Sequence, residues 1–289
     1  CILQNHLALG TYCDNQRMLW LSTKEEIYGF NFVRCQLTEV LFLILIISSS
    51  IILSSCATAP PKPTVYPPKE IFPRLPQHIL RQDVVHLVAP GETIWRISKM
   101  YDVPTQDVMR ANNLRKEEVL KKGQRLLVPN AAPVVPVISI YPSDIWRYII
   151  IHHSATDKGS SLYFDKYHQG KGWDGIGYHF VIDNGSRGKQ DGQIEVSPRW
   201  IKQEEGRHCK ASGMNKVAIG ICLVGNFNIE EPSKKQLEAL VYLIDLLRKQ
   251  YKIPLSRILG HGQVYGAKTD CPGKKFSWQE FQKRLTVKR

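Results

Sequence analysis

Apolar residues in the second half of the chain follow two kinds of pattern. Continuous apolar runs, typical of strands buried on both faces of a sheet, occupy residues 147–156 ("RYIIIHHSAT") and 216–227 ("KVAIGICLVGNF"). Between Ser233 and Tyr251 the apolar spacing changes to three and four residues, which predicts a helix with one apolar face. That face consists of Leu237, Leu240, Val241, Ile244, Leu247 and Tyr251. Together the patterns predict an α/β domain over residues 143–289, with a mixed central β-sheet flanked by helices.

Shorter patterns complete this domain. Residues 177–186 ("GYHFVIDNGS") are typical of a strand that ends in an Asn-Gly turn, and residues 192–196 ("GQIEV") fit its hairpin partner. The segment 277–285 ("SWQEFQKRL"), with Ser277 as its N-cap, predicts a closing helix.

A smaller β-α-α-β module is predicted over residues 83–130. Residues 84–88 ("VVHLV") have strand character, and the "PGET" turn that follows leads into a helix beginning near Ile94. A second helix begins at Thr105, and residues 121–129 ("KKGQRLLVP") give a turn and a closing strand.

Prolines mark the segments between these folded parts. They cluster over residues 60–76 and 129–142, where the chain cannot propagate a helix. We therefore predict linkers over residues 56–82 and 131–142.

Residues 40–53 ("VLFLILIISSSIIL") form an apolar segment of a different kind. A membrane-spanning helix needs about 20 residues, so this shorter run fits the apolar region of a secretory signal. The sequence "LSSC" ends at Cys56 and a proline-rich tether follows, an order that resembles the bacterial lipoprotein signal. The resemblance implies that residues 1–55 are a signal or upstream segment and that Cys56 is lipidated. A plain anchor helix, or a signal peptide with a chance cysteine, is the alternative.

Charge narrows the class of partner. Lys and Arg number 39 against 26 Asp and Glu, a formal net charge of +13. This balance favours a polyanionic partner, such as an anionic cell wall or membrane surface. The sequence has no basic run interleaved with aromatics, no zinc-finger spacing and no basic helix, so we do not expect nucleic acid as a partner.

The number of cysteines in the mature protein depends on whether residues 1–55 are removed. The three cysteines upstream of Cys56 would be lost with these residues, which leaves Cys209, Cys222 and Cys271 in an oxidising compartment. If Cys271 binds a metal, Cys209 and Cys222 either form a disulfide or remain core thiols.

The small module resembles a LysM domain over its whole length. The resemblance is carried by residues 86–114 ("HLVAPGETIWRISKMYDVPTQDVMRANNL") and 120–129 ("LKKGQRLLVP"). It implies binding of the N-acetylglucosamine-containing glycan of peptidoglycan or chitin. Within the module we interpret Trp95 and Ile97 as core residues rather than sugar contacts.

Histidines and a cysteine at strand ends and in glycine-rich loops are candidate metal ligands. A catalytic zinc site takes three protein ligands and keeps one open position. His152 and His153 point to opposite faces of one strand, so only one of them can join a shared site. His261 and Cys271 both lie in "GHGQVYGAKTDCPG". Spacing alone leaves open whether these residues bind zinc or are core-capping histidines and a free thiol.

Five motifs in the same domain resemble the zinc-dependent N-acetylmuramoyl-L-alanine amidases, a family that includes phage lysozyme-like amidases and peptidoglycan recognition proteins. In chain order they are "IIIHHSAT", "GWDGIGYHFVIDNG", "VAIGICLVGNF", "GHGQV" and "TDCPG". The resemblance implies a zinc ion bound by His152, His261 and Cys271. It also places Tyr178 near the metal and Thr269 two residues before the ligand cysteine.

One part of the resemblance is imperfect. Many relatives have Arg-Asp after "GH", whereas this chain has Gly262 and Gln263, and it places Lys268 beside Thr269. We expect Tyr178, together with Thr269 or Lys268, to stabilise the oxyanion that forms when an amide carbonyl is attacked.

The resemblances together predict a peptidoglycan hydrolase that cleaves the amide bond between N-acetylmuramic acid and L-alanine of the stem peptide, held on the wall by LysM. They imply Zn²⁺ as cofactor and His208 and Asn215 as substrate-binding residues. Lipid at Cys56 would anchor a monomer in the cell envelope, and Ala57 after it points to the outer membrane, facing the periplasm. The alternatives are a non-catalytic peptidoglycan recognition protein and a zinc peptidase acting on the stem peptide.

Overall fold

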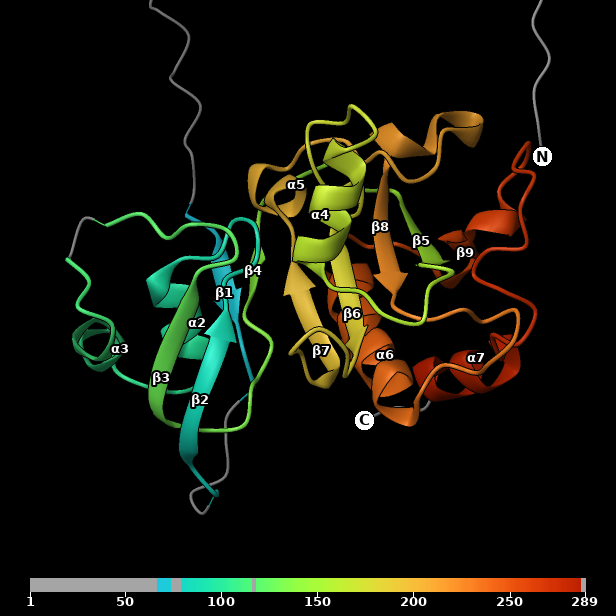
Figure 1. Ribbon diagram of the computed structural model, residues 1–289. Coiled ribbons are helices and arrows are strands. Elements are labelled where there is room, and N and C mark those ends of the chain that lie inside the picture. Colours follow the sequence, from blue (N-terminus) through green and yellow to red (C-terminus); the bar gives the residue numbers. More distant parts are fainter. Residues whose placement is uncertain (1–66, 74–78, 116–117, 287–289) are drawn as a thin grey trace, which may run out of the picture. The chain divides into compact units, whose positions relative to one another are not determined.

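The computed structural model describes residues 67–73, 79–115 and 118–286 (Figure 1). The predicted leader over residues 1–55, the lipidation site Cys56 and most of the first proline-rich linker lie outside these residues, so they stay predictions. Within the described ranges, no helix combines the length and the apolar character needed to cross a membrane.

The small module has the predicted β-α-α-β order. Strands β2 (Gln82–Leu87) and β3 (Arg125–Ala131) pair antiparallel, and helices α2 (Ile94–Met100) and α3 (Thr105–Ala111) lie between them in the chain. The side chain of Thr93 caps α2 by accepting a hydrogen bond from the backbone N–H of Arg96.

The interpretation of Trp95 as a core residue is wrong. Ile97 is fully buried, as predicted, but Trp95 is 40% exposed. Residues two apart on a helix point in directions about 200° apart, so both side chains cannot face the same small core. Trp95 is therefore available for contact with a ligand.

The segment between the two folded parts is ordered and partly buried. Strand β4 (Ile138–Ile140) lies within the predicted linker over residues 131–142, and it pairs antiparallel with β1 (Lys69–Ile71) from the first linker. Ile138 and Ile140 are buried in the core of the large domain. In the described residues of the two linkers the prolines correctly excluded a helix, but they did not exclude a short strand. The strand pair β1–β4 is where the prediction of two plain linkers differs from the structure.

The large domain is built on a five-stranded mixed sheet with the order β7-β6-β8-β5-β9 (Figure 1). β5 runs parallel to both of its neighbours, β8 and β9, and β8 also runs parallel to β6. β6 and β7 form the predicted antiparallel hairpin. The strands are β5 (Tyr148–His153), β6 (Phe180–Asn184), β7 (Asp191–Val196), β8 (Ala218–Leu223) and β9 (Ile258–Gly260). The predicted fold class is thereby confirmed.

Helices cover both faces of this sheet. The α-helices in the described part of this domain are α4 (Ser161–Gln169), α5 (Pro198–Lys202), α6 (Lys234–Gln250) and α7 (Trp278–Thr286). Three short 3₁₀ helices are η1 (Ala211–Lys216), η2 (Leu255–Arg257) and η3 (His261–Gln263). Ile149 and Ile151 of β5 pack with α6 and α7 in the main core, whereas Phe164 of α4 packs with β6 and β8 in a separate cluster. His152 alternates with Ile151, so its side chain leaves β5 on the face away from α6.

The N-terminus of α6 gives a first testable prediction. Ser233 accepts a hydrogen bond from the backbone N–H of Gln236, the side chain of Gln236 accepts one from Ser233 N, and the Ser233 hydroxyl donates to Asp191. Replacing Ser233 by alanine removes this capping box and should lower the free energy of unfolding by about 1 to 2 kcal/mol in urea denaturation. Ser256→Ala, at an exposed serine of η2, is the matched control. Equal stability of the two variants would contradict the prediction.

Candidate metal centre

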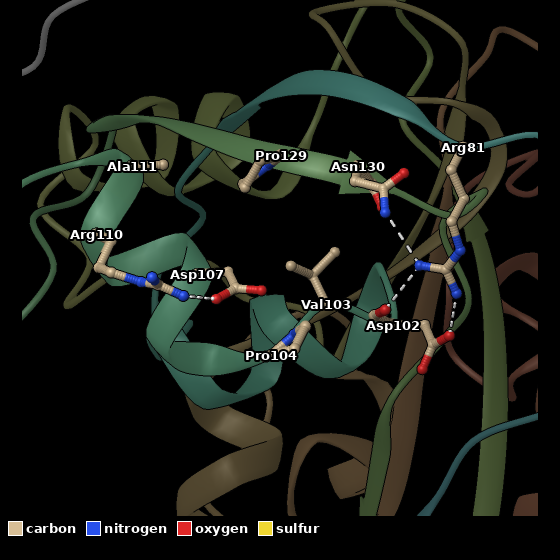
Figure 2. Close-up of a pocket in the computed structure, with 9 residues that line it drawn as sticks. All are labelled: Arg81, Asp102, Val103, Pro104, Asp107, Arg110, Ala111, Pro129 and Asn130. Carbon is tan, nitrogen blue, oxygen red and sulfur yellow. Dashed lines mark hydrogen bonds and ion pairs between the residues drawn. The ribbon is translucent and has the colours of Figure 1, made fainter.

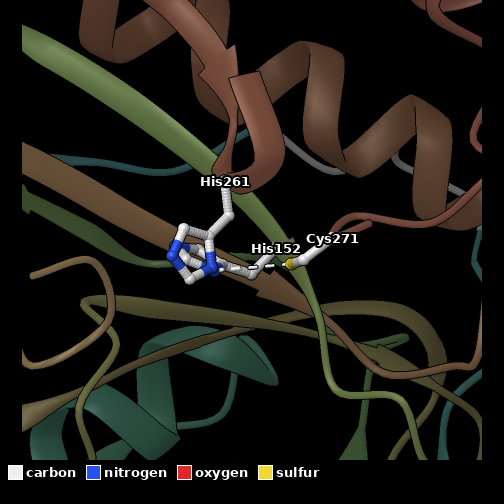
Figure 3. Close-up of side chains that lie close together, drawn as sticks. All are labelled: His152, His261 and Cys271. Carbon is white, nitrogen blue, oxygen red and sulfur yellow. Dashed lines mark hydrogen bonds between the residues drawn. The ribbon is translucent and has the colours of Figure 1, made fainter. Parts of the chain in front are cut away.

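Three candidate ligands predicted from the sequence meet at one end of the central sheet (Figure 3). Their ligand atoms, from His152, His261 and Cys271, all lie within 4.8 Å of one another. The Nδ1 atom of His152 lies 3.6 Å from the sulfur of Cys271, and the two imidazole centroids are 4.7 Å apart.

Strand pairing explains why the two histidines meet. β5 and β9 are parallel neighbours, and Ile151 lies opposite Gly260. His152 is the next residue of β5, and His261 directly follows the end of β9, so the register places both candidate ligands at the same level of the sheet.

Two glycines allow the cysteine to approach. A Cβ at Gly260 would lie 2.6 Å from Pro272, and a Cβ at Gly262 would lie 2.4 Å from the carbonyl oxygen of Thr269. The backbone N–H of Gly262 also donates to the carbonyl of Cys271 over 2.7 Å. Glycine at these two positions therefore lets the loop that carries Cys271 close against the residues beside His261.

The structure also explains part of the departure from the Arg-Asp pattern. The side-chain oxygen of Gln263 accepts a hydrogen bond from the backbone N–H of Gly260, 2.8 Å away. Gln263 thus stabilises the turn that holds His261, while Gly262 provides the close approach described above.

His153 points away from the ligands, as strand alternation predicts. Its Nδ1 atom accepts a hydrogen bond from the backbone N–H of Phe227 over 3.1 Å. The second histidine of the pair therefore fixes the loop that follows β8.

The surroundings keep these groups uncharged. Burial lowers the pKa of His152 well below its ordinary value, and the nearby imidazoles of His208 and His261 lower it further. Burial also lowers the pKa of His261. Burial raises the pKa of Cys271 to about 12.

The donor set fits zinc. Neutral imidazole nitrogens and a cysteine sulfur are ligands that zinc prefers, and three protein ligands leave a fourth position for water or substrate. A divalent cation at this place would favour the thiolate form of Cys271 over the thiol. The combined site would keep a net positive charge, because one thiolate cancels only one of two charges.

Tyr178 lies beside the candidate centre. Its ring centroid is 5.4 Å from that of His152, and its side chain packs against the cluster that contains Cys222. Burial, first of all, raises the pKa of Tyr178 well above its ordinary value, so the hydroxyl keeps its proton at neutral pH.

Thr269 and Lys268 lie on the loop that carries Cys271, and both are exposed. The Thr269 hydroxyl oxygen accepts a hydrogen bond from the backbone N–H of Cys271 over 3.2 Å. A hydroxyl that accepts still has its own proton to donate. Of Thr269 and Lys268, it is Thr269 that contacts the candidate ligand Cys271.

His208 and Asn215 lie behind the ligands. His208 is only 8% exposed, and its Nδ1 atom is 3.0 Å from Nε2 of His152. The side-chain oxygen of Asn215 accepts hydrogen bonds from the backbone N–H groups of His208 and Cys209. Substrate contact by these residues stays a prediction. Within the protein, Asn215 bonds the backbone at His208, and His208 in turn bonds the candidate ligand His152.

In the described part of the chain, Cys209 and Cys222 are both free thiols. Both are buried, Cys209 with Ile150 and Cys222 with Val181. The structure thus has core thiols rather than the disulfide that the sequence left open.

The small module carries an open hollow of its own (Figure 2). Its rim contains two ion pairs, Arg81 with Asp102 and Arg110 with Asp107. Arg81 also donates to the carbonyl oxygen of Asn130, 3.3 Å away. Because these charges cancel in pairs, the hollow does not concentrate the basic charge of the chain.

The fold and the centre together define a class: a mixed α/β domain with a three-ligand candidate zinc centre at the end of its sheet, preceded by a β-α-α-β module. Comparisons with known proteins agree with this class. The profile of the N-acetylmuramoyl-L-alanine amidase family matches residues 142–274, and that of the LysM domain matches residues 86–129.

Individual relatives match the same part of the chain. Peptidoglycan-recognition protein 2 of Holotrichia diomphalia is 35% identical over 102 residues, 32% of this chain and 49% of that protein. Peptidoglycan-recognition protein LB of Drosophila melanogaster is 33% identical over 150 residues, 46% of this chain and 60% of that protein. Peptidoglycan-recognition protein SC2 of the same species is 30% identical over 145 residues, 47% of this chain and 72% of that protein. The chain spans about half the length of the first of these relatives.

The chain therefore belongs to the family of N-acetylmuramoyl-L-alanine amidases and peptidoglycan recognition proteins, and it carries a LysM domain.

Proposed function

We propose that this protein is a zinc-dependent amidase that cleaves the bond between N-acetylmuramic acid and L-alanine in peptidoglycan, with its LysM domain holding it on the glycan. The observation that carries the proposal is the complete set of His152, His261 and Cys271, brought within 4.8 Å in a domain of the amidase family. A recognition protein that only binds peptidoglycan has no need of this set.

A zinc ion at these ligands supplies Lewis acidity for the amide carbonyl and a nucleophile from water at neutral pH. The chain supplies hydrogen-bond donors around it. Tyr178 keeps its phenolic proton and can donate to the carbonyl oxygen as negative charge develops there. The Thr269 hydroxyl is a second donor on the opposite loop, and each donor of this kind lowers the barrier by about 3 kcal/mol.

The products of digestion test this proposal. Residues 57–289 should release intact stem peptides with free L-alanine amino ends from purified peptidoglycan, and a zinc chelator should stop the release. Mass spectrometry of the soluble fraction identifies the new ends. New amino ends inside the stem peptide would indicate a zinc peptidase instead. Retained binding to peptidoglycan with no release in the presence of zinc would indicate a recognition protein.

We also propose that Cys56 is lipidated and anchors the protein in the outer membrane, facing the periplasm, as a monomer. The support is the sequence alone, with an apolar run, "LSSC" and a proline-rich tether in that order. Mass spectrometry of the N-terminal peptide from the membrane fraction should show acylation, and Cys56→Ser should move the protein out of that fraction. An unmodified Cys56 in a membrane-bound protein would contradict the proposal.

A further inference from the structure

A buried histidine that is not a candidate ligand hydrogen-bonds one that is. The Nδ1 atom of His208 lies 3.0 Å from Nε2 of His152. On the other side of the same ring, Nε2 of His208 lies 3.2 Å from the carbonyl oxygen of Ala218. His208 thus bridges the backbone of β8 and the first ligand.

These two contacts determine where the protons lie. A carbonyl oxygen can only accept, so Nε2 of His208 carries the proton of that ring. Nδ1 of His208 is then the acceptor, and His152 must donate to it from Nε2. Because a neutral imidazole has one proton, the lone pair of His152 is left on Nδ1, the atom that lies 3.6 Å from the sulfur of Cys271.

We propose that His208 is a positioning residue for the metal centre, which fixes the tautomer and the ring orientation of His152 so that Nδ1 of His152 faces the metal. Partners that bind the second nitrogen of a ligand histidine in this way usually contribute to metal affinity. The inference rests on the proposed zinc site, but it concerns residues of this chain that do not touch the metal.

The surroundings of His208 hold its ring in place. A Cβ at Gly206 or at Gly220 would lie 2.3 Å from Cδ2 of His208, so glycine at both positions makes room for the ring. Asn215 fixes the backbone on either side, since its side-chain oxygen accepts from the N–H groups of His208 and Cys209 over 2.9 and 2.8 Å. Asn215, too, thereby acts on the metal centre through His208.

Zinc affinity of the folded protein tests the proposal. His208→Leu removes the acceptor and should raise the zinc dissociation constant by about 10- to 100-fold, measured by competition with a chelating dye. His208→Asn keeps an acceptor oxygen near the position of Nδ1, so its dissociation constant should rise by less than about 10-fold. Circular dichroism of the metal-free proteins shows that each variant is folded.

His179→Leu is the matched control. His179 is also buried and bonds the backbone of Glu204 and Gly220, and its ring centroid is 5.6 Å from that of His208. It makes no hydrogen bond to His152, so zinc affinity should stay at the wild-type value even if the thermal stability falls. A loss of affinity equal to that of His208→Leu would overturn the proposal, because general loosening of this region would then account for both.

The tautomer itself can be observed. In the zinc-loaded wild-type protein, long-range ¹H–¹⁵N correlation spectra should show the proton of His152 on Nε2. A proton on Nδ1, or wild-type zinc affinity in His208→Leu, would overturn the role of His208 and leave the amidase proposal standing. Failure of the wild-type protein to bind zinc would overturn both.

Discussion

Replacing Cys271 by alanine should abolish zinc binding and peptidoglycan cleavage while leaving binding to the glycan intact. Cys271 supplies the only sulfur among the three candidate ligands and the only one that becomes negatively charged on binding. Without it, two neutral imidazoles remain, and metal and nucleophile are lost together. Loss of one oxyanion donor alone costs about 10²- to 10³-fold in rate, so the loss here should exceed about 10³-fold.

The measurement combines zinc content, release of stem peptides and sedimentation with peptidoglycan sacculi. Cys209→Ala is the matched control, because Cys209 is also a buried free thiol but is not one of the three grouped ligands. It should bind zinc and cleave like the wild-type protein. Cleavage by Cys271→Ala at the wild-type rate would show that the site is assigned to the wrong residues.

Much of the fold follows from local patterns in the sequence. The apolar run of β5 and the three-to-four repeat of α6 each depend on neighbouring residues alone, and the structure has both elements. The pairing of β4 with β1 joins segments about 70 residues apart and places Ser139 opposite Glu70. No local sequence pattern predicts this pairing. The proline content of both segments favoured linkers, and the burial of Ile138 and Ile140 against the large domain outweighed it.

The candidate site, too, has residues that could be predicted from the sequence and contacts that could not. His152, His261 and Cys271 were predictable because their motifs resemble a known family, although spacing alone could not separate ligands from capping residues. The bond between His208 and His152 was not predictable, since it joins a loop to a strand 56 residues earlier in the chain. The glycines that admit the His208 ring, Gly206 in a loop and Gly220 in β8, could not be interpreted from the sequence, because a glycine in a loop or a strand has several explanations.

Apart from the proposed zinc ion and its ligands, the hydroxyl of Tyr178 should make the largest contribution to the reaction rate. Tyr178→Phe keeps the ring, which packs in the cluster containing Phe164 and Cys222, and removes only the donor. If that donor stabilises the oxyanion, kcat should fall by about 10²- to 10³-fold. Zinc content should not change, because Tyr178 is not one of the three ligands, and KM should change little, because the donor acts on charge that forms only in the transition state.

A matched phenylalanine variant separates catalysis from packing. Tyr163 packs against the same cluster as Tyr178 and makes an edge contact with Phe164, so Tyr163→Phe removes a hydroxyl from the same region without touching the metal centre. It should cleave peptidoglycan at the wild-type rate. If Tyr178→Phe also retains full kcat, the Tyr178 hydroxyl has no part in the reaction, and the oxyanion donor must be sought on the loop that carries Cys271, at Thr269 or Lys268. If kcat falls only in Tyr178→Phe, with zinc content intact, the proton that burial keeps on this phenol is the one that stabilises the reaction.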